Sequence, residues 1–247
     1  MRRKAMFMRR THRFLITAFL MAFSAPGLTL ETLGRQAILV DAKTGAVLFE
    51  KNADERMSPS SMSKIITVYK LFEALRDGGL SLNDTFHVSE KAWRKGGSKM
   101  FVPINSRVKV EELIRGIIVQ SGNDATIVVA EGLAGSEASF AGELNATATS
   151  LGMTASNFTN ASGWPDPNHY TTARDLARLA IATIKNFPEH YHYYGEKSFT
   201  YNGIKQANRN PTLYRKLGAD GLKTGHTRAA GYGLTTSAAR NGRRLVL

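Results

Sequence analysis

The 247-residue chain contains no cysteine, which excludes disulfides, thiol nucleophiles and metal sites built on thiolates. This absence is compatible with an oxidising compartment, where a stray thiol is a liability. Only His190 and His192 are close together among the six histidines, and no His-Glu-x-x-His string occurs, so a metalloenzyme is a weak alternative. The body also lacks a basic run with interleaved aromatic residues, which argues against nucleic-acid binding. We expect no metal and no other cofactor.

Acidic residues are missing from the first 30 positions, although six lysines and arginines lie among the first 13. An almost wholly apolar run follows at 14–23, and small residues are frequent at 22–27. The run is about ten residues long, whereas a membrane-spanning helix needs about twenty. Residues 1–26 are therefore predicted to be a secretory signal peptide, with an uncleaved membrane anchor as the alternative. We expect an exported protein whose remaining positive charge is dispersed over its surface.

Apolar patterning divides the rest of the chain into strands, then helices, then strands again. Two short apolar runs joined by a glycine-containing turn predict a hairpin at 36–50. The helices are expected at 60–76, 110–119, 124–133, 140–151 and 172–184, and strands return at 198–201, 221–223, 231–237 and 244–247, with a turn at 238–243. We predict an α/β fold of the α+β type, in which an antiparallel sheet built from both chain ends packs on a helical block.

The first motif that carries chemistry is Ser-x-x-Lys, at the start of the first predicted helix. Ser61 and Lys64 are three residues apart and so share one face of a helix. A serine hydroxyl becomes nucleophilic when a base removes its proton, and a buried lysine with a lowered pKa can be that base. The helix is apolar nearly all round, which predicts such burial. Taken alone, the motif would more simply be a helix cap beside a solvated lysine.

Two further motifs follow in a fixed order. Ser-Gly-Asn lies between two predicted helices, where Ser121 can relay a proton and the Asn123 amide can bind a substrate amide. Lys-Thr-Gly ends a predicted strand, where Lys223 and Thr224 offer a cation and a hydroxyl to a carboxylate. Gly225 would let a substrate backbone approach the strand closely. Each motif alone fits a capping turn or a strand end, but the three together predict one acyl-transfer site.

The chain resembles the low-molecular-mass penicillin-binding proteins, the serine D-alanyl-D-alanine carboxypeptidases of the bacterial cell wall. Besides the three motifs, the resemblance is carried by the segments at 37–45, 59–65, 120–125, 208–210, 220–227 and 230–232. It implies a β-lactamase/transpeptidase-like catalytic domain at 30–247, in the periplasm or at the outer face of the cytoplasmic membrane. Family members usually continue through more strands, a closing helix, a second domain and an amphipathic helix on the membrane. We therefore expect a truncated domain, ending inside an edge or penultimate strand, and inner-membrane association of the full-length protein.

The resemblance also implies which residues perform the chemistry. Ser61 would be acylated by a peptidoglycan pentapeptide ending in D-Ala-D-Ala, with release of D-alanine. Lys64 would be the general base, and Ser121 would help to pass the proton to the leaving amine. β-Lactam antibiotics would react with the same serine as covalent inhibitors.

Substrate binding is assigned in the same way. Asn123 would hold the acyl-side amide, and Lys223 and Thr224 would bind the terminal carboxylate, together with Arg209. The backbone N–H groups of Ser61 and His226 would form the oxyanion hole. These assignments are expectations from the resemblance and not from spacing.

Two alternatives remain, one an enzyme and the other a non-catalytic module. A class A β-lactamase shares the motifs but needs a glutamate to activate the deacylating water, and the nearest look-alike is Glu143, inside a predicted helix. A non-catalytic module that binds peptidoglycan or a partner would keep the fold without the chemistry. The three intact motifs argue against such a module, and rapid hydrolysis of penicillin would separate the β-lactamase from the carboxypeptidase.

Overall fold

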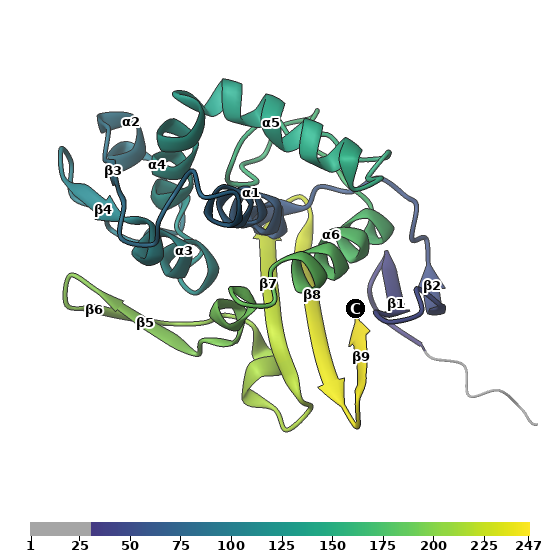
Figure 1. Ribbon diagram of the computed structural model, residues 1–247. Coiled ribbons are helices and arrows are strands. Elements are labelled where there is room, and N and C mark those ends of the chain that lie inside the picture. Colours follow the sequence, from purple (N-terminus) through teal and green to yellow (C-terminus); the bar gives the residue numbers. More distant parts are fainter. Residues whose placement is uncertain (1–30) are drawn as a thin grey trace, which may run out of the picture. The chain divides into compact units, whose positions relative to one another are not determined.

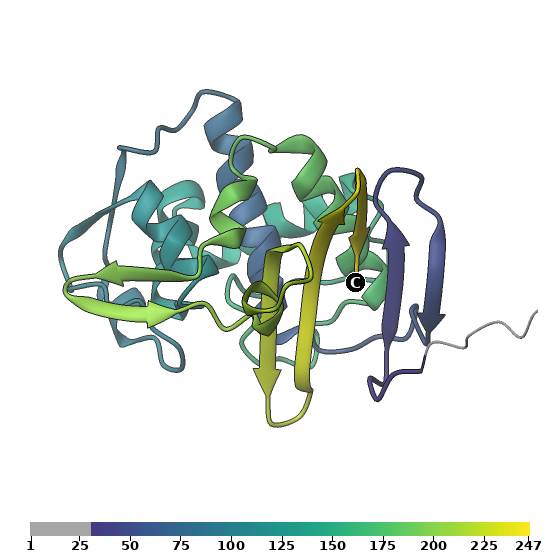
Figure 2. The ribbon, with the colours of Figure 1, turned by 90° about the horizontal axis from the view of Figure 1, so that it is seen from below.

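The computed structural model describes residues 31–247, so the predicted signal peptide lies outside the described residues. Residues 32–247 form one unit, and both of its ends contribute to one five-stranded antiparallel sheet. Its strands, in spatial order, are β2 (Val47–Lys51), β1 (Ala37–Asp41), β9 (Arg243–Val246), β8 (Gly231–Arg240) and β7 (Ala219–Thr227). Figures 1 and 2 show the dark blue β1–β2 hairpin beside the yellow C-terminal strands. The predicted sheet from both chain ends is confirmed.

The hairpin that joins β8 to β9 is tighter than predicted. The turn consists of Asn241 and Gly242, with φ angles of 51° and 73°, and the expected turn at 238–243 is therefore too long. Both positions need positive φ, which asparagine and glycine adopt most readily, and Asn-Gly is a strong two-residue hairpin signal. The β7 strand is also longer than the predicted segment at 221–223.

A helical block packs on the sheet (Figure 1). It consists of the 3₁₀ turn η1 (Ser60–Ser63) and the helices α1 (Lys64–Arg76), α3 (Val110–Ile118), α4 (Asn123–Ala134), α5 (Glu137–Ser150) and α6 (Ala173–Asn186). Helix α1 contacts all four of the other helices and β7. Ile65, Ile66 and Leu71 have no exposed surface, which confirms a helix that is apolar nearly all round. No helix in residues 31–247 is both long and apolar enough to cross a membrane.

Several short elements escaped the sequence analysis. They are β3 (Thr85–His87), α2 (Glu90–Arg94), β4 (Arg107–Lys109), β6 (Ile204–Ala207), η2 (Tyr191–Gly195) and η3 (Pro211–Tyr214). β3 pairs with β4, and β6 pairs with the correctly predicted β5 (Ser198–Tyr201). In η2, Tyr194 is fully buried and packs edge-on against Phe72. The aromatic residues of η2 belong to the core because they cover the end of α1.

The last strand lies in the middle of the sheet. Val246 pairs with Val40 of β1 on one side and with Ser237 of β8 on the other. The prediction of an edge or penultimate strand is therefore wrong, since β9 is the third of the five strands. Val246 is fully buried and β9 packs against α6, whereas Leu247 is 45% exposed.

Val246→Ala should lower the free energy of unfolding by about 2 kcal/mol, because it removes buried methyl groups at the centre of the sheet. Leu247→Ala is the matched control: it deletes more atoms, but from an exposed side chain, and should cost less than about 1 kcal/mol. Urea unfolding followed by circular dichroism measures both values. A larger loss for Leu247→Ala would contradict the central position of β9.

Candidate active site

The side-chain amine of Lys64 is fully buried at the start of α1. It lies 2.7 Å from Asn123 Oδ1, 2.6 Å from the Ser162 carbonyl oxygen and 3.0 Å from Ser61 Oγ. The first two oxygens are acceptors only, so they must each take a proton from the amine. In the neutral amine, the lone pair is then left for the Ser61 hydroxyl. This geometry suits a base that removes the proton of Ser61.

Burial is the main reason why the pKa of Lys64 lies well below its usual value. The charges of Lys223 and Arg209 lower it further, and Lys95 does so more weakly. The carboxylate of Asp124 acts in the opposite direction. A lowered pKa keeps part of the amine neutral at ordinary pH, as a general base requires.

The second motif occupies the turn into α4. Asn123 is the first residue of that helix, and its Nδ2 donates to the Gly96 carbonyl oxygen at 2.8 Å while its Oδ1 accepts from Lys64. Ser121 is buried and has a φ of 59°, but its hydroxyl makes no hydrogen bond to Ser61 or Lys64 within the described part of the chain. The structure therefore joins Asn123 directly to the base. Ser121 precedes Asn123 by two positions in the chain.

The third motif lies on β7. Lys223 is 3% exposed, and burial together with the charge of Arg209 lowers its pKa to about 7. Its Nζ donates to the Thr224 carbonyl oxygen at 3.2 Å, and no carboxylate pairs with it among residues 31–247. Arg209 donates to Ser98 Oγ at 2.6 Å. These two cations form a positive group beside the serine, as the binding of a carboxylate requires.

Gly225 packs closely against the turn that carries Ser61. A Cβ at this position would lie 2.8 Å from the Pro59 carbonyl oxygen and 3.1 Å from Ser60 Cβ. Glycine therefore lets β7 pack against the turn that carries Ser61, and the expected approach of a substrate backbone at this position stays a prediction. The His226 side chain is exposed and stacks on Tyr232 at 4.2 Å, which leaves its ring away from Lys64.

A cavity of about 260 Å³ opens beside the serine. Its lining consists of Ser61, Gly97, Ser98, Asn123, Ser162, Gly163, Trp164, Pro165, His226 and Thr227. Residues of all three motif-bearing elements thus meet around one hollow. A larger hollow of about 480 Å³ lies between β1 and β8, but none of the predicted site residues lines it. We take the smaller cavity as the site, because the nucleophile Ser61 lines it and the base Lys64 lies 3.0 Å from Ser61 Oγ.

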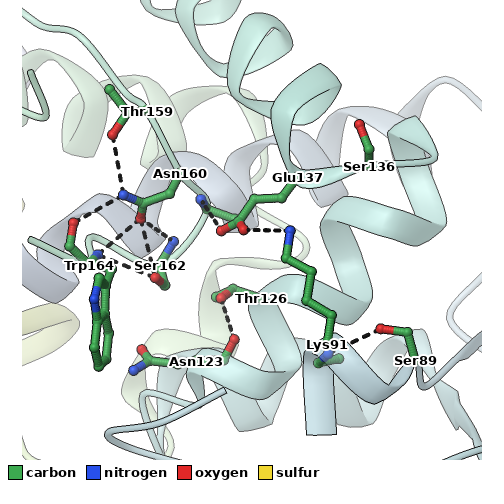
Figure 3. A network of polar contacts seen from close by, with 12 residues as sticks. Ser89, Lys91, Asn123, Thr126, Ser136, Glu137, Thr159, Asn160, Ser162 and Trp164 are labelled. Atoms are coloured by element: carbon green, nitrogen blue, oxygen red, sulfur yellow. Dashed lines mark hydrogen bonds and ion pairs between the residues drawn. The ribbon is translucent and has the colours of Figure 1, made fainter. Parts of the chain in front are cut away.

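The loop after α5 is a part of the site that the sequence analysis missed. Asn160 Oδ1 accepts hydrogen bonds from the backbone N–H groups of Gly163 and Trp164, both at 2.9 Å, and from that of Ser162 at 3.2 Å. Figure 3 shows this cradle, which presents the Ser162 carbonyl to Lys64. The signal was present as a dense run of asparagine, serine, glycine, tryptophan and proline at 160–165.

Two acids, the buried Asp124 and the half-buried Glu137, hold backbone segments next to the cavity. Glu137 accepts from the Ala161 N–H at 3.3 Å and pairs with Lys91 of α2 at 3.0 Å (Figure 3). Asp124 accepts from the N–H groups of Met100 and Phe101, each at 2.8 Å. Both acids fix backbone and neither lines the cavity. Their role could not be read from a motif, since it depends on which loops lie next to them.

Behind the serine turn, Ser63 Oγ lies 2.8 Å from His169 Nε2. The Thr159 N–H donates to Nδ1 of the same ring, so the imidazole is neutral with its proton on Nε2. Burial lowers the pKa of His169 to about 4. This histidine ties the loop at 159–169 to the turn that carries Ser61.

The alternatives find little support in the geometry. Glu143 lies on α5, is 45% exposed and pairs with Lys70 at 3.8 Å, so it is an ordinary residue of the helix surface. It does not line the cavity, where a class A β-lactamase would need its glutamate. Within residues 31–247, no group of three histidine and acidic residues is arranged to hold a metal ion.

Comparison with known proteins gives a consistent result. The profile of the S11 peptidase family, D-alanyl-D-alanine carboxypeptidase, matches residues 22–247. The D-alanyl-D-alanine carboxypeptidase DacA of Haemophilus influenzae is 42% identical over 226 residues, which cover 90% of this chain and 56% of its own. This chain thus spans little more than half of that relative.

Solved structures agree with the fold. Penicillin-binding protein 5 from Haemophilus influenzae has 40% identity and a TM-score of 0.86, over 89% of this chain and 66% of its own. Penicillin-binding protein D2 from Listeria monocytogenes, solved in an ampicillin-bound form, has 29% identity and a TM-score of 0.80, over 88% and 89%. The predicted transpeptidase-like fold is confirmed, and the chain belongs to the D-alanyl-D-alanine carboxypeptidase family of S11 serine peptidases.

Proposed function

We propose that the chain is the catalytic part of an exported serine-type D-Ala-D-Ala carboxypeptidase. Its substrate is the peptidoglycan pentapeptide that ends in D-Ala-D-Ala, and β-lactams acylate the same serine. The activity contributes to cell wall biogenesis and cell shape, and the whole protein associates with the inner membrane. The observation that carries the proposal is the buried Lys64 amine, whose two fixed acceptors leave one position for Ser61.

Acylation begins when Ser61 Oγ attacks the carbonyl carbon of the scissile peptide bond and its proton passes to Lys64 Nζ. The oxyanion that forms accepts hydrogen bonds from the backbone N–H groups of Ser61 and His226. The proton then moves to the leaving nitrogen, for which we assign Ser121 as the relay. D-Alanine departs, and an ester on Ser61 remains. Water attacks this ester with Lys64 as base, which releases the shortened peptide and restores the serine.

Substrate orientation follows from the positive charges close to Lys64. Lys223 and Arg209 lack carboxylate partners among the described residues and suit the terminal carboxylate, together with the Thr224 hydroxyl. Asn123 accepts a hydrogen bond from Lys64 with Oδ1 and offers a side-chain N–H to the acyl part of the peptide. Family membership supports a D-Ala-D-Ala substrate, and the ampicillin complex of the Listeria protein supports a reaction with β-lactams.

Ser61→Ala should abolish both the covalent penicillin adduct and the release of D-alanine, because it removes the nucleophile. Intact-mass spectrometry after incubation with benzylpenicillin measures the adduct, and circular dichroism checks the fold. Ser60→Ala is the matched control on the same turn and should still be acylated. An adduct that persists in Ser61→Ala would place the nucleophile elsewhere.

Lys64→Arg should slow acylation by about 10²–10⁴-fold, because a guanidinium keeps its proton and cannot act as a base. The donors to Asn123 and Ser162 are retained, so this change separates basicity from structural support. Stopped-flow acylation by a chromogenic β-lactam gives the rate. A rate close to that of the unchanged protein would rule out Lys64 as the general base.

Lys223→Ala should weaken transition-state binding of peptides with a free terminal carboxylate by about 2–5 kcal/mol, since one partner of a buried charge pair is lost. The corresponding C-terminal amides should lose much less. The comparison requires kcat/KM for a matched acid and amide pair. An equal loss on both substrates would show that Lys223 does not bind the carboxylate.

The pH dependence of kcat/KM should reflect two lysines that must be in opposite protonation states. Lys64 acts when neutral, above its lowered pKa, whereas Lys223 binds a carboxylate when protonated, below a pKa of about 7. For a free-acid substrate, kcat/KM should therefore fall as the pH rises through about 7, and the C-terminal amide should lack this fall. Profiles that coincide for acid and amide would refute the assignment.

A further inference from the structure

Trp164 forms a rigid apolar wall of the cavity. Its indole is 43% exposed, and its backbone is held on both sides: its N–H donates to Asn160 Oδ1 at 2.9 Å and its carbonyl accepts from Asn160 Nδ2 at 3.0 Å. A Cβ on Gly97 would lie 3.1 Å from the indole Cζ3 and 2.6 Å from Asn123 Nδ2. The indole therefore lies next to the amide that we assign to the acyl side of the substrate.

A cation lies over this indole. Lys95 Nζ is 4.7 Å from the centre of the Trp164 ring, and the side chain is half-buried. On the preceding helix, Lys91 pairs with Glu137 and Arg94 pairs with Glu90. Lys95 has no acidic partner among residues 31–247. Its charge is thus available to an anion that enters the cavity.

The charges around Lys64 fall into two groups. Lys223 and Arg209 belong together, since Arg209 lowers the pKa of both Lys223 and Lys64. Lys95 lowers the pKa of Lys64, whereas burial and the charge of Arg209 lower that of Lys223. No aspartate or glutamate lines the described cavity. The first group suits the terminal carboxylate of the peptide, and the second group has no assigned anion.

We propose that Trp164 and Lys95 form an acyl-side subsite for an aliphatic side chain that ends in a carboxylate. This side chain belongs to the peptide residue on the N-terminal side of D-Ala-D-Ala, so the inference rests on the proposed function. The flat indole packs against the methylene groups, and the flexible lysine leaves the ring to pair with the carboxylate. The two residues thereby determine specificity and take no part in the proton transfers.

The test uses two acyl-D-Ala-D-Ala peptides that differ at one group, with an adipoyl chain ending in a carboxylate or in its primary amide. Lys95→Met should lower the ratio of kcat/KM for the carboxylate peptide to kcat/KM for the amide peptide about fivefold, because any change in the pKa of Lys64 acts equally on both peptides. The difference should shrink as salt is added, because the lysine is partly exposed. Arg94→Met, which removes a neighbouring cation already paired with Glu90, is the matched control and should change neither value.

A second readout does not need turnover. Trp93→Phe leaves Trp164 as the single tryptophan, so its fluorescence reports ligands in the cavity. Adipoyl-D-alanine, which has no scissile bond, should bind more tightly than its amide, and Lys95→Met should remove that preference. Equal losses on the two ligands, or no loss, would overturn the subsite. Intact discrimination by fluorescence without any acylation of Ser61 would overturn the proposed function and leave the subsite standing.

Discussion

The site depends on an amine that is kept away from both water and carboxylates. Lys64 is fully buried, and its nearest partners are a side-chain amide, a backbone carbonyl and a hydroxyl. A carboxylate in the same place would hold the proton on the amine and raise its pKa. Neutral oxygen acceptors also orient the amine, but they raise its pKa less than a carboxylate would. The nearby cations reinforce the effect of burial.

This amine also joins three separate parts of the chain. Lys64 begins α1, Asn123 begins α4, and Ser162 lies in the loop after α5. Acceptors that lost the amine would be buried without a donor, which carries a free-energy penalty of about 1–3 kcal/mol each. Substitutions at Lys64 therefore act on the local structure as well as on the chemistry. Glu137 and Asp124 stabilise this arrangement indirectly, because each accepts hydrogen bonds from the backbone next to the cavity.

The sequence was most informative where chemistry or strong periodicity demanded particular residues. Ser61, Lys64, Asn123 and Lys223 could be named because each motif combines a reactive group with a suitable element. The apolar pattern of α1 was also legible, and so was the start of α6, where Thr172 accepts from the Asp175 N–H. Ser162 was not legible, because it contributes a backbone carbonyl, which every residue possesses. Gly225 was noticed, but its neighbour Pro59 is 166 positions away and no local signal identifies such a contact.

The central position of β9 imposes an order on folding. The N-terminal hairpin finds its inner partner only when Val246 reaches Val40, so the sheet closes by one of the most distant contacts in the sequence. Until then, the inner edge of β1 offers unpaired N–H and C=O groups to any other strand. The pairing of β9 with β1 forms slowly, because closing so long a loop carries an entropic cost. During synthesis, the helical block can be complete while the inner edge of β1 is still unpaired, so prompt pairing of β9 protects against edge-to-edge association.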